Sequence, residues 1–199
     1  MYLEVRGSVG TKYLHLVRHG QYIMDKDQKK YGQLTTLGRF QARRTGKRLN
    51  EYAISVVHVS TMIRAQETGE IVLDGLNSVK WRNSSLLIEG IPQFPKELIK
   101  RQKLEKSKIR EAKQRMDSAF KKFFNPYKGK GERHEVLVCH GNIIRYLVAK
   151  SIEVDTSKWI NFDIFQCSIS TVAIEPDGKR RLLTFGEIGH IPIKKRTFL

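Results

Sequence analysis

Short apolar runs rich in strand-forming residues recur along the chain, and longer amphipathic stretches follow them. The runs at 13–17 and 55–59 precede segments in which apolar residues repeat at helical spacing, and so does the run at 135–139. Units of a strand followed by a helix are typical of a parallel sheet with helices on its faces. The pattern therefore predicts an α/β fold.

Two of the predicted helices begin at recognisable positions. Thr35 or Thr36 can cap a helix whose apolar residues fall broadly on one face. A second helix, from Met62 to about Leu73, has Arg64 in its first turn, where a cation is unfavourable by about a few tenths of a kcal/mol or more. Because helix N-termini bind anions, this placement indicates that Arg64 serves a bound anion. The apolar residues of the first helix are Leu37, Phe40, Ala42 and Leu49.

The last part of the chain predicts a β-hairpin. Residues 168–175 alternate well enough for a strand, Pro176-Asp177-Gly178 is typical of a turn, and 181–185 supplies the returning strand. A hairpin added to strand–helix units predicts a mixed, mostly parallel sheet flanked by helices in a three-layer sandwich.

The segment 96–133 is strongly basic, with fourteen Lys or Arg residues against five acidic ones. Within it, apolar residues at helical spacing predict an amphipathic helix from about 107 to 124. We interpret the segment as a helical insertion over the sheet within a single domain, 13–199, and residues 1–12 as an N-terminal extension. The apolar positions are Ile109, Ala112, Met116, Phe120 and Phe123.

Composition narrows the class of protein only in part. The chain of 199 residues suits one domain with a sizeable core, and its 40% hydrophobic content is typical of a globular protein. The net charge of +17 is compatible with nucleic acid, an anionic membrane or acidic and phosphorylated substrates. A lysine-rich solvated surface without any partner explains it equally well.

The two cysteines and the lack of a recognisable targeting signal favour an intracellular protein. Cys139 and Cys167 cannot form a disulfide framework and are interpreted as buried thiols in a reducing compartment. The sequence contains no apolar run of membrane-spanning length and no signal peptide. We expect a cytoplasmic protein, or a mitochondrial one if an N-terminal segment has been removed, with membrane contact only through such a segment.

The first strand ends at Arg18-His19-Gly20, which combines three residues suited to phosphate chemistry. Ligands of open α/β sheets bind beyond the carboxyl ends of strands. There, Arg offers a planar fork to phosphate oxygens, and a neutral imidazole is a nucleophile near pH 7. Gly lets backbone N–H groups approach a ligand closely. The tripeptide alone is compatible with a structural His as well.

Four further motifs follow in order: 34–42, which opens a helix, 60–68 after the next strand, 87–92, and 138–146 around His140. Together with the first motif they resemble the histidine phosphatase superfamily, from Tyr13 to about Pro192. The segments after His19, around Glu89 and after His140 look like its subgroup of mitochondrial Ser/Thr protein phosphatases. The resemblance implies a phosphomonoester hydrolase with a phosphohistidine intermediate.

The resemblance also assigns roles. His19 is the expected nucleophile, with its second ring nitrogen held protonated by a nearby backbone carbonyl. Arg18, Arg64 and His140 are expected to clamp the phosphate, and Glu89 to protonate the leaving oxygen and later activate water. Substrate binding is assigned to Gln21, Gly141 and Asn142.

The remaining histidines receive no role. His15 and His58 fall on strands and His134 in a charged loop, so that structural or solvated side chains are expected; His190 is left open as a residue that lines the site. No cysteine pair, histidine pair or carboxylate cluster has the spacing of metal ligands. We therefore expect no cofactor and activity without an added divalent cation.

Two alternatives compete with a phosphoprotein phosphatase. Phosphoglycerate mutases of this family continue the first motif with Glu-Ser, whereas this chain has Gln21-Tyr22, and they place their acid in a different segment. A basic nucleic-acid or scaffold protein is disfavoured because no RNA-binding or zinc motif is present. We expect a phosphorylated protein or a small phosphomonoester as partner and no nucleic acid, and leave a homodimer open.

Overall fold

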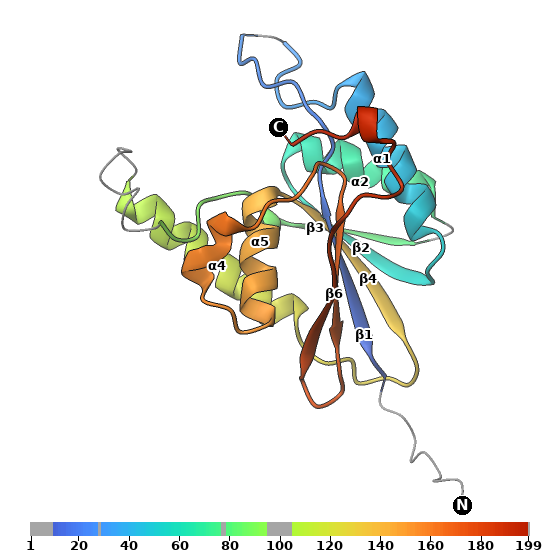
Figure 1. Ribbon diagram of the computed structural model, residues 1–199, viewed down its shortest axis with the longest axis vertical. Helices are drawn as coiled ribbons and strands as arrows, with labels where there is room; N and C mark the ends of the chain where they lie inside the picture. The colour runs from blue at the N-terminus through green and yellow to red at the C-terminus, as the bar shows by residue number, and fades with distance from the viewer. Residues whose placement is uncertain (1–9, 28, 77–78, 95–104, 199) are drawn as a thin grey trace, which may run out of the picture.

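The computed structural model describes residues 10–27, 29–76, 79–94 and 105–198. Its centre is a six-stranded sheet in the order β3-β2-β4-β1-β5-β6 (Figure 1). The strands are β1 (Lys12–Arg18), β2 (Ile54–Ser60), β3 (Lys80–Ser84), β4 (Arg133–Cys139), β5 (Ile169–Ile174) and β6 (Arg180–Glu187). The four strands β1 to β4 run parallel, and β5 and β6 join antiparallel to them. The predicted mixed, mostly parallel sheet is thus confirmed.

Helices cover both faces of the sheet, as predicted. On one side lie α1 (Thr36–Leu49) and α2 (Ile63–Asp74), and on the other α4 (Lys106–Phe123) and α5 (Gly141–Ser151). The alternation of β1 divides its side chains between these layers. Leu14 and Leu16 are buried in the core with α4 and α5, whereas Val17 is buried in the core with α2. Short 3-10 turns at Ser85–Leu87, Thr156–Asn161 and Ile193–Lys195 complete the described elements.

The face by which α1 packs differs from the predicted one. Leu37 and Phe40 are only partly buried. The helix lies so close to α2 and to the turn after β1 that small or polar residues make the contact, and a pattern of apolar residues does not detect such a face. Its buried residues are Gly38, Gln41, Ala42, Thr45, Gly46 and Leu49. Thr35 is the N-cap and accepts a hydrogen bond from the N–H of Gly38, in line with one of the two predicted caps.

Two further differences concern strands. The edge strand β3 was not predicted, because it is polar, pairs with β2 alone and buries only Ser84, so that its sequence shows no apolar alternation. His134 was expected in a loop but lies in β4 and is buried. Its ring stacks on the ring of Tyr13 and forms a hydrogen bond with His15. These contacts allow a polar side chain to be buried in this strand.

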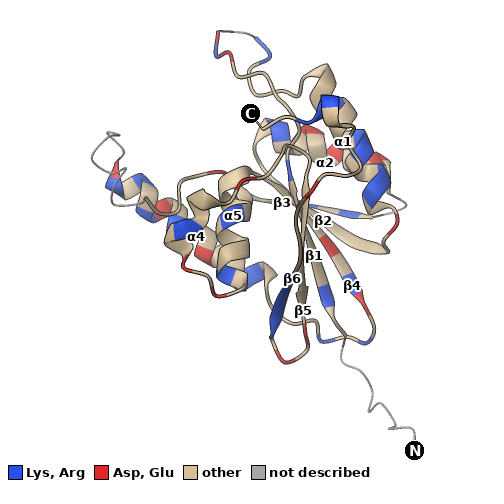
Figure 2. Cartoon of the chain, viewed as in Figure 1, with Lys and Arg blue, Asp and Glu red and all other residues tan. Residues whose placement is uncertain are grey.

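The predicted amphipathic helix is confirmed as α4, which buries Ala112, Met116, Ala119 and Phe123, the last three in the core shared with α5. Figure 2 shows basic residues on α1 and α5 as well as on α4, so the positive charge is not confined to one helix. The segment 95–104 lies outside the described residues, and the domain boundaries and the insertion stay predictions. Among the described residues, no helix is both long and apolar enough to cross a bilayer.

Candidate active site

The four parallel strands end at one edge of the sheet, and each delivers polar residues to it. β1 ends at Arg18 and is followed by His19, β2 ends at Ser60, and β4 is followed by His140. The turn after β3 leads to Glu89. Because parallel strands present their carboxyl ends together, residues up to 122 positions apart in the chain (Arg18 and His140) meet here.

His19 is fixed in one tautomer by its neighbours. Its Nδ1 lies 2.8 Å from the carbonyl oxygen of Gly20, which can only accept, so Nδ1 carries the proton. Its Nε2 accepts a 3.0 Å hydrogen bond from Nε of Arg64. Burial lowers the pKa of His19 well below its ordinary value, and the charges of Arg64 and Arg18 lower it further. The imidazole is therefore neutral at pH 7, with its lone pair at Nε2.

Gly20 serves packing as well as the site. A Cβ at this position would lie 2.7 Å from the carbonyl oxygen of Gly38, so glycine permits the close approach of α1 to the turn after β1. The N–H of Gly20 donates to Oγ1 of Thr68 at 3.0 Å. The N–H of Gly20 is therefore bound within the protein, and the expectation that a glycine here lets backbone N–H groups approach a ligand stays a prediction.

His140 faces His19, with ring centroids 5.1 Å apart. Its Nε2 lies 2.8 Å from Oγ of Ser60, and its Nδ1 is buried without a hydrogen-bond partner. Burial lowers the pKa of His140 well below its ordinary value, and His19 and the arginines add to the effect. A buried polar atom without a partner is costly and is typical of a position that a ligand completes.

Glu89 reaches the N-terminus of α5. Its Oε2 accepts from the N–H of Asn142 at 3.2 Å, and its Oε1 accepts from the N–H of Gly90 at 3.1 Å. Burial of the carboxyl raises the pKa of Glu89, while these two N–H groups and then Arg64 and Arg18 oppose the rise. A carboxyl whose pKa is raised can hold a proton nearer to neutral pH than a solvated one.

Arg18 lies across the N-terminus of α5. Its Nη1 donates to the carbonyl oxygen of Ile164 at 2.6 Å, and its Nε is buried without a partner. A Cβ at Gly141 would lie 3.4 Å from that Nε, so the glycine leaves the guanidinium just enough room. Arg18, His19, Arg64, Glu89 and His140 are thus brought together as predicted.

The residues assigned to substrate binding take different positions. Gly141 and Asn142 form the N-terminus of α5 beside Arg18 and Glu89. The side chain of Gln21 instead accepts a hydrogen bond from Oγ1 of Thr35 at 2.7 Å, at the N-cap of α1. Their contact with a substrate stays a prediction.

Several residues that shape the site were not predicted to have a role there. Tyr22 packs edge-on against His19, and the guanidinium of Arg64 lies over its ring at 4.7 Å. Arg115 of α4 donates to the carbonyl oxygens of Ile88 and Glu89. Arg115 is identified as a residue of the site only by its tertiary contacts. Tyr22 could have been found from the sequence, because it belongs to the motif that follows His19.

The other histidines are structural, as expected. His15 is buried beside His134 and Thr171, and burial lowers its pKa to about 3. His58 is buried on β2. His190, left open in the sequence analysis, makes its described hydrogen bonds outside the site, to Thr45, Cys167 and Glu187.

This arrangement suits the transfer of an anionic group. Arg64 donates to the lone pair of His19, while the charge of Arg18 and the ring of His140 lie close to the same imidazole and a carboxyl of raised pKa lies near both arginines. Fixed donors around a nucleophile stabilise the charge of a phosphoryl group. In the part of the chain that the structure describes, no group of three or more His, Cys, Asp or Glu side chains could hold a metal ion.

Fold and site together define an α/β enzyme that acts on phosphate esters. Residues 14–186 match the model of the histidine phosphatase superfamily, branch 1, and the chain belongs to that family. It is a phosphohydrolase of this superfamily, as the sequence motifs predicted.

Named relatives support the predicted subgroup. A protein of Caenorhabditis briggsae named serine/threonine-protein phosphatase Pgam5, mitochondrial, is 35% identical over 202 residues, covering 98% of this chain and 70% of its own length. A protein of the same name from Xenopus tropicalis is 34% identical over 199 residues, covering 98% and 71%. The crystal structure of phosphoglycerate mutase from Plasmodium falciparum is 27% identical, with a TM-score of 0.66 over 92% of this chain and 96% of its own.

Proposed function

We propose that the protein hydrolyses phosphoserine and phosphothreonine in proteins through a phosphohistidine on His19. The observation that carries this proposal is the fixed tautomer of His19, whose Nδ1 donates to Gly20 and whose Nε2 lone pair is turned towards Arg64. A neutral imidazole held in this way is ready to attack phosphorus.

Binding of the phosphate comes first. Nε of Arg64, which donates to His19 in this structure, turns to a phosphate oxygen, because a charged oxygen is the stronger acceptor. Arg18 and Nδ1 of His140, both with buried unpartnered nitrogen atoms, complete the clamp. The lone pair of His19 is then free to react.

The chemistry takes two steps. First, Nε2 of His19 bonds to phosphorus, the bond from phosphorus to the ester oxygen breaks, and Glu89 gives its proton to that oxygen. Then Glu89 takes a proton from water, the water oxygen bonds to phosphorus, and the bond to His19 breaks. Inorganic phosphate leaves, and both residues return to their starting protonation states.

The choice of substrate rests on the relatives. The two named phosphatases are about one third identical over nearly the whole chain. They support a protein substrate and a mitochondrial location for this chain. The substrate-binding roles of Gln21, Gly141 and Asn142 and the independence from metals belong to the same proposal.

A panel of phosphopeptides tested beside 3-phosphoglycerate decides between phosphatase and mutase. We expect phosphate release from phosphoserine and phosphothreonine peptides, and neither hydrolysis nor isomerisation of 3-phosphoglycerate. The His19→Ala variant serves as the blank for contaminating phosphatases. Isomerisation of 3-phosphoglycerate without peptide turnover would identify a mutase instead and overturn the proposal.

A further inference from the structure

Glu89 lies in a segment without regular secondary structure. Residues 88–94 follow the 3-10 turn Ser85–Leu87 and belong to no helix or strand. The N–H of Ile88 donates to the carbonyl oxygen of Ser85 at 3.3 Å, but among the described residues no backbone N–H donates to the carbonyl oxygens of Ile88 or Glu89. Side chains must therefore satisfy these two acceptors and fix the course of the chain at Glu89.

Arg115 of α4 binds both of these carbonyl oxygens. Its Nη2 donates to the oxygen of Ile88 at 3.1 Å and to that of Glu89 at 3.0 Å. The terminal nitrogen of a guanidinium carries two hydrogens in one plane, so a single nitrogen atom can hold two acceptors, and the positive charge strengthens both bonds. Because one carbonyl precedes the Cα of Glu89 and the other follows it, Arg115 holds the main chain on both sides of this residue.

The segment approaches α4 closely at Gly90. A Cβ at this position would lie 2.8 Å from Nη2 of Arg115 and 2.8 Å from Cβ of Ala112, so the glycine leaves room for the guanidinium. Beyond this contact, Glu89, Gly90 and Ile91 line a cavity of about 480 Å³ against the first half of α4. Because side chains do not fill that space, the hydrogen bonds of Arg115 hold the segment on this side.

We propose that Arg115 is a positioning residue for the general acid Glu89. Arg115 holds the main chain of Glu89, while the N–H of Asn142 binds its carboxyl from the N-terminus of α5 at 3.2 Å. With both ends fixed, the carboxyl keeps one orientation towards the leaving oxygen and, in the second step, towards water. The proposal rests on the proposed function in taking Glu89 as the acid and base, and it gives the basic helix α4 a part in the reaction.

The variant Arg115→Met tests this role. Methionine has an unbranched apolar side chain and a helix propensity close to that of arginine, so it keeps the packing of the stem and removes the guanidinium. The rates are measured with a phosphoserine peptide and with p-nitrophenyl phosphate. These substrates differ in how much the leaving oxygen needs a proton, which separates a defect in Glu89 from general damage to the site.

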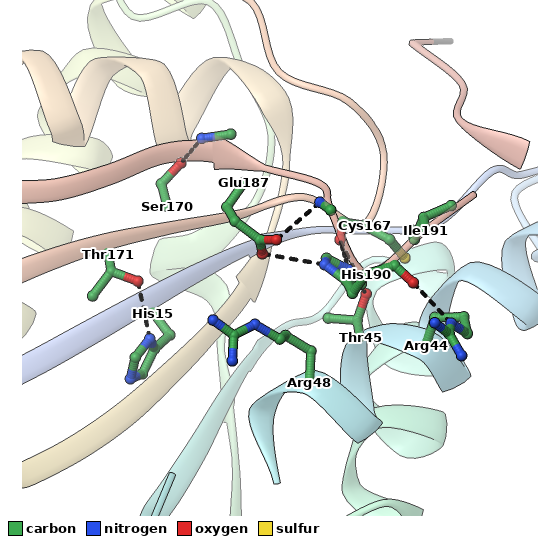
Figure 3. Close-up of polar contacts among 12 residues, drawn as sticks. His15, Arg44, Thr45, Arg48, Cys167, Ser170, Thr171, Glu187, His190 and Ile191 are labelled. Atoms are coloured by element: carbon green, nitrogen blue, oxygen red, sulfur yellow. Dashed lines mark hydrogen bonds and ion pairs between the residues drawn. The ribbon is translucent and has the colours of Figure 1, made fainter. Parts of the chain in front are cut away.

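Two further arginines provide matched controls, because each also donates to a main-chain carbonyl oxygen away from Glu89. Nε of Arg44 on α1 donates to the carbonyl oxygen of His190 at 2.7 Å (Figure 3). Arg180 of β6 donates to that of Phe124 from Nε and Nη2, at 3.4 and 3.3 Å. β6 begins at the edge of the sheet where β1 begins, opposite the site. Arg44→Met and Arg180→Met should therefore stay within about twofold of the wild-type rates.

We expect kcat for the phosphoserine peptide to fall about 10- to 100-fold in Arg115→Met, since a displacement of about 1 Å in a reacting group can cost ~100-fold. KM for the peptide should change by less than about twofold, because the phosphate clamp is untouched. With p-nitrophenyl phosphate, the first release of phenolate should stay within about threefold of the wild type, and the later turnover should slow.

A double variant shows whether Arg115 acts through Glu89. If it does, Arg115→Met should reduce peptide turnover by less than about twofold when Glu89→Gln is already present, because residues that act as a unit give non-additive losses. Damage elsewhere in the site would instead lower the rate by the same factor in both backgrounds. The folded state of each variant is checked by circular dichroism well below its melting temperature.

Four outcomes would overturn the proposal: an unchanged kcat in Arg115→Met, an equal loss in the control variants, additive losses in the double variant, or a raised KM at constant kcat, which would identify a direct contact with the peptide. Should Arg115→Met fail to fold, Gly90→Ala replaces it, because its Cβ displaces the guanidinium; an unchanged kcat there again counts against the proposal. Failure of the proposed function looks different, because the wild type would then form no phosphohistidine or Glu89→Gln would keep full turnover.

Discussion

Replacement of Glu89 by glutamine tests the proposed general acid most directly. The carboxyl accepts from two backbone N–H groups, those of Gly90 and Asn142, at 3.1 and 3.2 Å. Glutamine has the same shape but only one oxygen, so its NH₂ group must face one of these donors. Because one hydrogen bond is lost at a partly exposed site, we expect a stability loss of about 1 kcal/mol.

The effect on catalysis should be larger and should depend on the leaving group. General acid catalysis contributes about 10²- to 10⁴-fold, so turnover of a phosphoserine peptide by Glu89→Gln should fall by that order. A phenolate leaves with little assistance, and formation of the phosphohistidine from p-nitrophenyl phosphate should suffer much less. Hydrolysis of the intermediate still needs Glu89 as a base, which predicts a burst of phenolate followed by slow turnover.

The pH dependence gives a second measure of the same residue. Burial raises the pKa of Glu89, so its protonated form, which the first step requires, persists to higher pH than for an ordinary glutamate. In the wild type, kcat/KM for phosphoserine peptides should decline as the pH rises through this raised pKa. Glu89→Gln cannot titrate and should lose that decline.

The measurement is stopped-flow detection of p-nitrophenolate beside phosphate release from a phosphoserine peptide. Equal losses for both substrates, with no burst and an unaltered pH profile, would refute the assignment. Glu89 would then only position the phosphate, and the proton donor would have to be another group, with His140 the first to test.

The remaining predictions concern the nucleophile, metals and acid stability. His19→Ala should abolish turnover yet leave the melting temperature within a few degrees of the wild type. Wild-type enzyme quenched under alkaline conditions should carry its phosphate on His19, and phosphate found on Ser, Cys or Asp would exclude this nucleophile. EDTA should leave the rate unchanged, and a loss restored by a divalent cation would reveal a missed ligand set. Burial raises the pKa of Asp117, but hydrogen bonds from Lys150, Tyr146 and Lys113 outweigh it and hold the pKa at about 2, below the ordinary 3.8. The resulting stability of about 2 kcal/mol is present above the unfolded pKa and is lost as the pH falls from about 4 to 2. Asp117→Asn should remove this part of the pH dependence in urea unfolding, and an identical acid profile would contradict it.

Local sequence patterns determined most of the secondary structure of this protein. Strands with β-branched apolar runs and helices with apolar residues at a period near 3.6 are properties of short windows, and five of the six strands and all four described helices were predicted from them. The residues Arg18, His19, Arg64, Glu89 and His140 were also found from the sequence, through motifs that resemble those of the family. All of them except Glu89 follow or open a predicted element. The exception among the strands is β3, whose polar exposed edge has no alternation to detect.

Tertiary structure alone decided which of these residues support one another. Ser60 meets His140 across 80 positions of the chain, and Nε of Arg64 meets His19 across 45. The N–H of Cys167, a residue in the left-handed conformation, binds the carbonyl oxygen of Arg18 only because β5 pairs with β1 in the sheet. Such contacts depend on strand order and helix packing, and no window of the sequence contains both partners. For that reason the sequence alone indicated His19 as the nucleophile that we propose, while the groups that hold its ring in place were identified only from the fold.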